Sequence, residues 1–280
     1  MSTSNRLVID SSEVAILCNQ VSKSYRIVDQ KSADSNHGNI GHGGKIVEAV
    51  KNISLLVERG QSVGLIGRNG SGKSTLMRMI AGSESASSGQ VLVSHRPTLM
   101  GIAPALHPWL TGRQNILLGC LAIGMDYEAA KEEVEPIAEW TSIGDAIDRP
   151  MSTYSSGMAA RVSFAISTAV QPDILLIDEA LSTGDAAFQR KAAQRTQQLL
   201  DRAGTMVLVS HYPNQIREMC EIAVWMDSGR IVSQGASNIV SKQYAEWTSM
   251  LDNSKILEAE KFLKECMHNS PKVSFSSSMG

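Results

Sequence analysis

The alternation of hydrophobic and polar residues predicts β-strands in the first quarter of the chain. Residues 13–27 and 52–67 alternate with a period of two, which is the pattern of strands that bury one face. The second segment is interrupted by Glu-Arg-Gly at 58–60, where we expect a turn between two strands. Residues 29–45 are rich in Gly, Ser, Asn and His and hold almost no hydrophobic residues, so we predict a mobile loop there.

The next part of the chain alternates between helical and strand patterns. We predict a helix from Ser74 to Ala81, two short strands in QVLVS and PTLMGI, a helical stretch with Thr111 and Asp126 as N-terminal caps, and a helix at 156–169. Strand and helix then alternate, at 173–177, 185–201, 205–209, 213–219 and 222–226. This order predicts an α/β fold with a parallel sheet.

The last part of the chain has a helical pattern and then a polar end. One helix is expected to end near Trp247. Ile256, Ala259, Leu263 and Cys266 recur at the spacing of a second, amphipathic helix. We expect the final SPKVSFSSSMG to be disordered.

Composition narrows the classes of function. The chain has 280 residues, of which 42% are hydrophobic and 19% charged, enough for one large or two small domains. The net charge of −2 does not indicate a protein that binds duplex DNA or an anionic membrane with its whole surface. The four cysteines form no Cys-x-x-Cys pair, which favours a reducing cytoplasm over a zinc or dithiol site. The start lacks a signal-peptide pattern and the longest hydrophobic run, 116–125, is shorter than the roughly 18 residues of a membrane span, so we expect no transmembrane segment.

One segment carries a phosphate-binding motif. Residues 67–74 have the P-loop spacing Gly-x-x-x-x-Gly-Lys-Ser, between a predicted strand and a predicted helix. Glycines permit positive φ angles and close approach of the backbone, while the loop N–H groups and the helix N-terminus face the anion. A chance match is the alternative, at roughly one in 100 chains of ordinary composition. The strand and helix on either side argue against it.

The residue types in this loop suggest how a nucleotide would bind. Lys73 would reach the β- and γ-phosphates, and the Ser74 hydroxyl would ligate Mg²⁺. The residues expected to bind ATP here are Gly67, Asn69, Gly70, Ser71, Gly72, Lys73, Ser74 and Thr75.

Two carboxylates end the hydrophobic segment PDILLIDEA at 172–180. We expect Asp178 to hold Mg²⁺, commonly through water, and Glu179 to polarise the water that attacks the γ-phosphate. A core strand followed by surface acids is the alternative interpretation. The P-loop upstream makes the metal site the better one.

A turn of small residues opens a helix just before the acidic strand. Residues 153–167 read TYSSGMAARVSFAIS. Tyr154-Ser155-Ser156-Gly157-Met158 is similar to Leu-Ser-Gly-Gly-Gln, the signature of the ATPase subunit of the ATP-binding cassette (ABC) family, with the serine and the second glycine kept and three positions changed. The resemblance covers roughly residues 13–235. It implies that Ser155, Ser156 and Gly157 contact the γ-phosphate in the ATP site of the other subunit.

Further resemblances follow in the order of the family. Tyr25 matches the aromatic residue that stacks on adenine. Asp185, in LSTGDA, matches the D-loop residue that crosses the dimer interface, and His211 matches the switch histidine that senses the γ-phosphate. Taken singly, these residues would more often be a core tyrosine, a helix cap and a structural histidine. Most relatives have a glutamine where this chain has Ile102, so no residue is assigned to that role.

The segments PALHPWLTGRQNI and LLIDEALSTGDAAFQRKA look most similar to the branch that exports lipid-linked polysaccharides and teichoic acids. The resemblance implies an α/β P-loop NTPase core with an antiparallel β subdomain and an inserted α-helical subdomain at about 103–170. The ATPase domain would span 1–248 and a short helical tail 249–280, without a carbohydrate-binding sandwich.

The resemblance also implies cofactors and partners. The protein would hydrolyse ATP with Mg²⁺ as a homodimer. It would drive a separate integral-membrane permease, in two copies, from the cytoplasmic face of a bacterial cell membrane, with no nucleic-acid partner. His107, Pro108 and Trp109 would line the groove that receives the permease, although a plain loop is an equal alternative.

Other classes of function stay open at this point. A P-loop kinase would have an acceptor-binding lid in place of the signature, and a GTPase would need Asn-Lys-x-Asp, which the sequence lacks. A non-transport cassette protein in DNA maintenance or translation, or an ABC ATPase of another transporter class, is a further alternative. His37 and His42 suggest a metal only weakly, since two histidines without further ligands are more often solvated.

Overall fold

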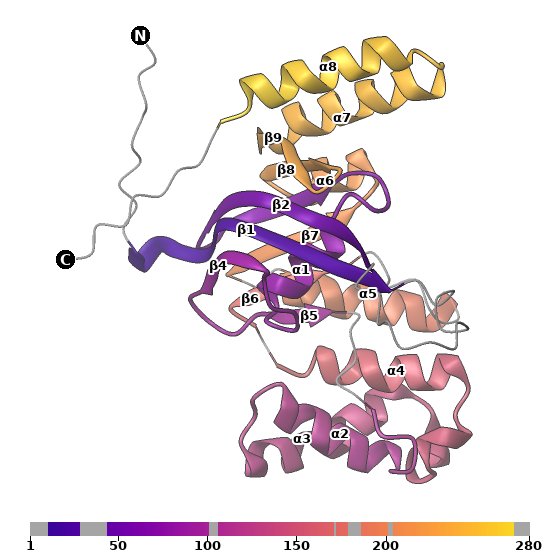
Figure 1. Ribbon diagram of the computed structural model, residues 1–280. Coiled ribbons are helices and arrows are strands. Elements are labelled where there is room, and N and C mark those ends of the chain that lie inside the picture. The colour runs from indigo at the N-terminus through magenta and orange to yellow at the C-terminus, as the bar shows by residue number, and fades with distance from the viewer. Residues whose placement is uncertain are drawn as a thin grey trace, which may run out of the picture. The chain divides into compact units, whose positions relative to one another are not determined.

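The computed structural model describes residues 11–28, 44–100, 106–170, 172–178, 186–200 and 204–271. The chain divides into two compact units. The P-loop unit comprises Met1–Glu58, Val63–Ser94 and Ser210–Gly280, and the helical unit comprises Arg59–Ser62 and His95–Val209. Figure 1 labels most of the helices and strands of both units.

An antiparallel sheet of three strands belongs to the P-loop unit (Figure 1). A 3-10 helix, Ser11–Glu13, leads into β1 (Val14–Val28). This strand pairs with β2 (Gly44–Glu58) on one side and with β4 (Ser88–Val93) on the other. The predicted alternation is confirmed by buried side chains along β1 and β2, which include Ile16, Cys18, Val21, Ile53, Leu55 and Val57.

The start of β2 differs from the prediction. The strand begins at Gly44, so residues 44 and 45 of the predicted loop pair with β1 instead. A partner strand supplies this pairing, and local composition carries no signal for it. The remaining loop residues, 29–43, lie outside the described residues. The predicted turn is confirmed, with Gly60 at φ 82°, and it connects β2 to a strand of a different sheet.

The second set of strands in the P-loop unit surrounds β3 (Ser62–Ile66). Strand β3 is parallel to β8 (Ile222–Asp227), and β8 is antiparallel to β9 (Arg230–Ala236). Helix α1 (Lys73–Ile80) follows β3, and α6 (Pro213–Met219) precedes β8. The strand and helix predicted on either side of the P-loop are therefore confirmed.

Two helices follow β9 and lie side by side (Figure 1). They are α7 (Ser237–Asp252) and α8 (Ile256–Asn269). Trp225 of β8 packs against Tyr244 and Trp247 of α7, with ring centroids 5.7 and 5.3 Å apart. The predicted amphipathic α8 is confirmed, with Ala259 and Cys266 buried. The preceding helix continues past Trp247, the predicted end, to Asp252.

The helical unit contains three parallel strands. Strand β6 (Ile174–Ile177) pairs with β5 (Thr98–Met100) and with β7 (Thr205–Ser210), and α5 (Ala186–Leu200) lies between β6 and β7 in the sequence. All four residues of β6 are buried. The predicted parallel sheet is confirmed by these pairs.

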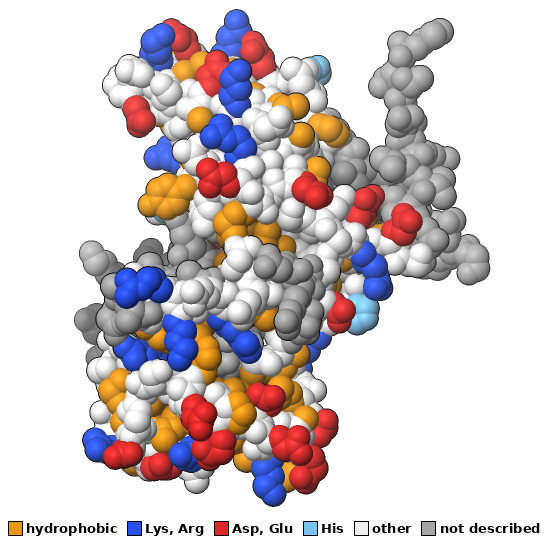
Figure 2. All heavy atoms as spheres, turned by 180° about the vertical axis from the view of Figure 1, so that it is seen from behind, with side chains coloured by type: hydrophobic (Ala, Val, Ile, Leu, Met, Phe, Trp, Pro, Cys, Tyr) orange, Lys and Arg blue, Asp and Glu red, His pale blue; other side chains and the backbone are white. Residues whose placement is uncertain are grey.

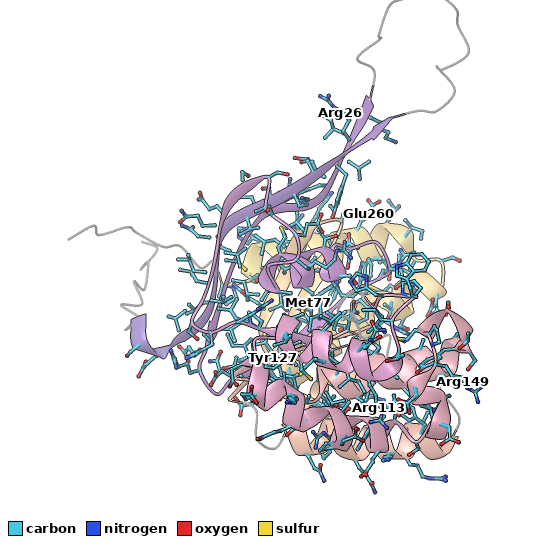
Figure 3. All side chains as sticks on the ribbon, turned by 90° about the horizontal axis from the view of Figure 1, so that it is seen from below. Arg26, Met77, Arg113, Tyr127, Arg149 and Glu260 are labelled. Carbon is cyan, nitrogen blue, oxygen red and sulfur yellow. The ribbon has the colours of Figure 1, made fainter. Side chains whose placement is uncertain are left out.

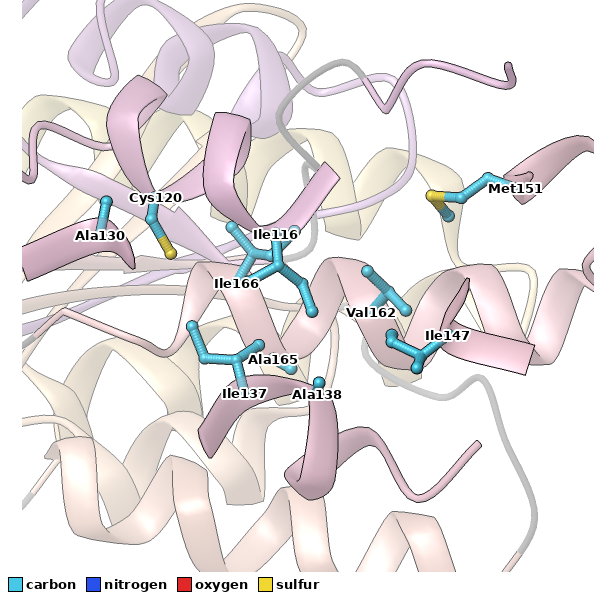
Figure 4. Packing of buried hydrophobic residues seen from close by; sticks show 10 residues of the cluster. All are labelled: Ile116, Cys120, Ala130, Ile137, Ala138, Ile147, Met151, Val162, Ala165 and Ile166. Carbon is cyan, nitrogen blue, oxygen red and sulfur yellow. The ribbon is translucent and has the colours of Figure 1, made fainter. Parts of the chain in front are cut away.

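Helices α2 (Gly112–Ala122), α3 (Tyr127–Thr141) and α4 (Ser156–Ser167) share one hydrophobic core (Figure 4). Ile116, Ile137 and Ile166 lie in this core together with Val162 and Ile147, the last from a 3-10 helix at Gly144–Asp148. A second 3-10 helix, Met151–Thr153, leads to α4.

Both predicted N-terminal caps in this unit are confirmed. The Thr111 side chain accepts a hydrogen bond from the Gln114 backbone N–H, and the Asp126 side chain accepts one from Ala129. On the surface, Arg113 of α2, which is labelled in Figure 3, forms ion pairs with Glu135 and Asp148. These pairs join α2 to the segments that follow it.

The face shown in Figure 2 carries Lys and Arg side chains interspersed with Asp and Glu. Among the described residues, no helix has the length and hydrophobicity needed to cross a lipid bilayer.

Candidate nucleotide-binding site

The P-loop lies between buried strand β3 and helix α1. Gly70 and Gly72 have φ angles of 80° and 102°, which confirms the predicted need for positive φ. A Cβ atom at Gly67 would collide with the backbone oxygen of Met226, and one at Gly72 would collide with the backbone oxygen of Ala49. The glycines therefore let the loop pack tightly against β2 and β8.

Lys73 lies against the same loop and is 7% exposed. Its Nζ donates hydrogen bonds to the backbone oxygens of Gly67, at 2.6 Å, and Arg68, at 2.9 Å. It also lies 3.5 Å from Ser71 Oγ. Since α1 begins at Lys73, the ammonium group and the positive end of the helix dipole occupy one end of the loop, where an anion is stabilised.

The turn between β8 and β9 is hydrogen-bonded to the P-loop. The N–H of Gly229 donates to the backbone oxygen of Ser71 at 3.0 Å, and the backbone oxygen of Gly229 accepts from the N–H of Lys51 at 2.8 Å. This residue thus joins the P-loop to β2. Sequence patterns did not reveal it, because the partners are far apart in the chain.

Tyr25 is held on helix α1 through a cluster of charged residues. Its hydroxyl donates to Glu84 Oε1 at 2.5 Å, and Arg78 of α1 donates to the other oxygen of the same carboxylate at 3.0 Å. Lys23 lies 3.2 Å from Glu84 and 5.3 Å from the centre of the tyrosine ring. Burial raises the pKa of Glu84, but hydrogen bonds from Tyr25, Arg78 and Lys23 outweigh it and lower that pKa below its ordinary value.

His211 lies just after β7. Its ring contacts that of Tyr212, with centroids 3.8 Å apart. The turn is fixed by Ser210, whose hydroxyl donates to Gln215 Oε1 at 2.7 Å and accepts from the Tyr212 N–H at 3.0 Å. His211 belongs to the P-loop unit, as Tyr25 and Lys73 do.

Asp178, Ser155, Ser156 and Gly157 belong to the helical unit. Asp178 directly follows buried β6, as predicted. Ser155 is the N-cap of α4, and its Oγ accepts from the Met158 N–H at 3.2 Å. Both serines are exposed, and a Cβ atom added at Gly157 would meet only Ser155 Oγ, at 3.9 Å, among the described residues. Ile102 and the predicted functional residues Glu179 and Asp185 lie outside the described residues.

A network of hydrogen bonds joins the loop at 107–111 to the turn before the signature residues. The N–H of Ser152 donates to the backbone oxygen of Pro108 at 2.7 Å, and the N–H of Met151 donates to that of Leu110 at 2.9 Å. Trp109, in the middle of the loop, is 79% exposed. These hydrogen bonds tie the loop to the turn that leads into α4.

The side chain of Asn115, in α2, holds the loop at 107–111 through hydrogen bonds. Its side chain is buried, accepts from the His107 N–H at 2.7 Å, and donates to the backbone oxygens of His107, Leu110 and Thr111. Sequence reasoning did not single it out, since an asparagine inside a helix carries no special pattern.

We expect Asn115→Ala to lower the free energy of unfolding by about 2–4 kcal/mol, because the loop at 107–111 loses four partly buried hydrogen bonds to this side chain. Thermal or urea unfolding would measure it. Asn253→Ala is the matched control, because that side chain bonds Ser249 on an exposed helix end and should cost less than about 1 kcal/mol. Equal losses for the two variants would contradict the role given to Asn115.

The cysteines lie away from this chemistry. Cys18, Cys120, Cys220 and Cys266 are all buried and unpaired with one another. Burial raises the pKa of Cys18 and Cys220 to about 12 and that of Cys120 to about 11. These thiols stay protonated at neutral pH and are poor nucleophiles.

Comparison with known proteins gives the family. The model of the family described as ABC transporter matches residues 50–182. The O-antigen export system ATP-binding protein RfbB of Klebsiella pneumoniae is 35% identical over 199 residues, which cover 71% of this chain and 81% of that protein. The chain belongs to the ABC transporter family.

Other relatives and solved ABC proteins agree with this assignment. The teichoic acids export ATP-binding protein TagH of Listeria innocua is 37% identical to this chain. The match covers 78% of this chain and 65% of TagH. A solved dimer of the ATP-binding cassette MJ0796, bound to ADP and Pi, has a TM-score of 0.60 and 20% identity, over 79% of this chain and 98% of that one, which shows the shared fold. This chain spans 40% to 65% of the length of four curated relatives that it matches.

Proposed function

We propose that this chain is the ATP-hydrolysing subunit of an ABC exporter, which drives a separate membrane permease to move a lipid-linked polysaccharide or a teichoic-acid-like polymer across the cytoplasmic membrane. The observation that carries the proposal is the P-loop, whose buried Lys73 and close-packed glycines lie between β3 and α1. The export activity rests on the relatives named for O-antigen and teichoic acid export.

The residues present fit a magnesium nucleotide. Gly67 and Gly72 leave no room for a Cβ, and the loop ends at the N-terminus of α1, where backbone N–H groups and the helix dipole stabilise a phosphate. Ser74 and Asp178 would hold Mg²⁺, which would neutralise charge that develops on the transferred phosphate. Tyr25 would stack on adenine, held in place by Glu84.

Hydrolysis is assigned to two residues. Glu179 would accept a proton from the attacking water, and His211 would donate a hydrogen bond to the γ-phosphate and sense its loss. Asp185 would cross the interface to the second copy. These roles rest on the motif order together with the places of Asp178 and His211 after β6 and β7.

The second copy of the chain would complete each site. Ser155, Ser156 and Gly157 lie at the exposed N-terminus of α4, where they are free to meet a phosphate held by another P-loop. Contacts of this kind exist only while the γ-phosphate is bound, so ATP would close the homodimer and hydrolysis would reopen it. The loop at 107–111 would pass this movement to the permease, because it is bonded to the turn before Ser155.

We place the protein on the cytoplasmic face of the cell membrane, bound there through the permease. Co-expression with a candidate helical permease, followed by purification in detergent, tests the proposal. We expect the two polypeptides to purify together and the ATPase rate to require both. Phosphate transfer to an acceptor other than water would favour a kinase, and a chain that hydrolyses ATP but binds no membrane protein would favour a non-transport cassette.

Ser155 allows its two roles to be separated. We expect Ser155→Ala to lower ATP turnover at least about tenfold through the lost phosphate contact and to cost about 1 kcal/mol of stability through the lost cap. Ser155→Asn keeps a good cap and should lower only turnover. Steady-state ATPase assays and thermal unfolding measure the two effects, with the exposed Ser152→Ala as control. Normal turnover in Ser155→Asn would remove the serine from the site.

A further inference from the structure

A cavity of about 510 Å³ lies in the P-loop unit between the bulged parts of β1 and β2, strand β9 and the end of α8. Its volume is in the range of small-molecule sites. The polar residues that line it include Gln20, Lys51, Asn52, Arg230, Gln234 and Ser270. None of the residues described in its lining carries a carboxylate or an aromatic ring.

The charge of the cavity points to an anion. Lys51 and Arg230 both line it, and neither forms an ion pair with a carboxylate within the part of the chain that the structure describes. An arginine and a lysine in one lining, without a carboxylate among the described lining residues, are suited to binding a phosphate group. The lack of an aromatic platform in the described lining disfavours a nucleobase as the ligand.

The neutral groups in the cavity suit hydroxyl groups. Carboxamides from Gln20, Asn52 and Gln234 both donate and accept hydrogen bonds. The Ser270 hydroxyl is buried and has no hydrogen-bond partner among the described residues, so it can still take one. The Gln234 amide donates to the backbone oxygen of Pro271 at 2.6 Å, which leaves its carbonyl oxygen as an acceptor.

The cavity wall has an unusual backbone. Gln20 and Asn52 have φ angles of 49° and 51°, in the left-handed region that residues other than glycine seldom adopt. Serine hydroxyls hold both in place: Ser54 Oγ accepts from the N–H of Gln20 at 3.3 Å, and Ser22 Oγ accepts from the N–H of Asn52 at 2.9 Å. Such conformations cost energy, and here the serine hydroxyls and the register shifts between β1 and β2 maintain them.

Gly229 connects this cavity to the P-loop. Arg230 and Lys51 line the cavity, and Gly229, next to Arg230, accepts from the backbone N–H of Lys51 and donates to the backbone oxygen of Ser71. Gly229 has a φ of 82°, and a Cβ there would lie 2.8 Å from the Ala49 oxygen, so the turn has little room to move independently. A ligand that draws Lys51 and Arg230 together would therefore shift the P-loop backbone.

We propose that this cavity binds a small phosphate ester that carries hydroxyl groups, and that its binding changes the affinity of the P-loop for ATP. Binding of the ester in this cavity is independent of the function proposed above. The effect of the ester on ATP affinity rests on that proposed function, because it requires ATP to bind at the P-loop. Coupling between two binding sites is reciprocal, so bound ATP must change the affinity of the cavity for the phosphate ester by the same factor.

Titration calorimetry on the full chain tests the first part. Without nucleotide, sn-glycerol 3-phosphate and glucose 6-phosphate should bind saturably and glycerol should not. Gln234→Glu keeps the size of the side chain, loses the hydrogen bond to Pro271 and adds a carboxylate to the lining that holds the two cations, so it should weaken binding at least about tenfold, as should Arg230→Gln. Lys264→Gln, on the exposed side of α8, is the matched control and should bind normally.

Vesicles distinguish a soluble ligand from a lipid headgroup. Flotation with phosphatidylglycerol vesicles, but not phosphatidylcholine vesicles, would assign the site to a headgroup, provided that Gln234→Glu abolishes it. The site would be overturned if neither the soluble phosphate esters nor the phosphatidylglycerol vesicles bound saturably. Equal binding by wild type and Gln234→Glu would overturn it as well.

The coupling has its own measurement. ATP affinity should change at least about fivefold when glycerol 3-phosphate is saturating, and Gln234→Glu should remove this change while ATP affinity without the ester stays normal. Ester binding with no effect on ATP affinity would overturn the coupling alone. A chain that binds the ester but no ATP would refute the proposed function and leave the anion site standing.

Discussion

Glu179→Gln is expected to lower the ATPase rate by at least about a hundredfold while ATP still binds, because the amide cannot accept a proton from the attacking water. Glu179 follows Asp178 in the sequence, and Asp178 directly follows the fully buried strand β6, which motivates this expectation. With hydrolysis blocked, the γ-phosphate would stay in place and the two copies would remain closed around it. Size-exclusion chromatography with light scattering, in ATP and Mg²⁺, should show a stable dimer of the variant.

The control for this experiment is Glu218→Gln, an exposed glutamate on α6, which should hydrolyse ATP at the normal rate and remain in exchange between monomer and dimer. A normal ATPase rate in Glu179→Gln would refute the assignment of Glu179. A slow variant that elutes as a monomer in ATP would instead refute the closed dimer.

Lys73→Ala is expected to weaken ATP binding by about ten- to a hundredfold, since a charge-assisted hydrogen bond to phosphate is worth about 1.5–3 kcal/mol. The same ammonium group also bonds the backbone oxygens of Gly67 and Arg68, so the loop itself should become less ordered. Titration calorimetry with ATP measures the affinity, and hydrogen exchange of the loop amides measures the order.

Lys242→Ala removes an exposed lysine from α7 and should leave both measurements unchanged. Lys73→Met separates the charge from the packing of the side chain, because the stem remains buried while the charge is lost. An ATP affinity equal to wild type in Lys73→Met would show that the cation does not meet the phosphates.

Local signals in the sequence predicted much of the fold. The caps at Thr111 and Asp126 depend on short side chains that bond N–H groups three residues away, so the spacing alone reveals them. The buried run of β6 and the glycines of the P-loop are equally local. The start of β2 at Gly44 was missed because strand pairing, and not composition, decides it.

The supporting residues of the site could not be predicted in the same way. Glu84 accepts a hydrogen bond from Tyr25, and Gly229 donates one to Ser71, although the two residues of each pair lie far apart in the sequence. Their types, a loop glutamate and a turn glycine, are common and carry no periodic signal. Sequence motifs therefore locate the residues that would contact ATP, whereas the fold is needed to locate those that hold them.

The support of the P-loop by Gly229 also bears on how the protein is made. Ser71 leaves the ribosome long before Gly229, by on the order of ten seconds at ordinary rates of synthesis. During that interval the phosphate-binding loop lacks the hydrogen bond that steadies it. A nascent chain should therefore acquire its nucleotide only after the β8–β9 hairpin has emerged, so that translation itself sets the time at which this subunit first becomes competent.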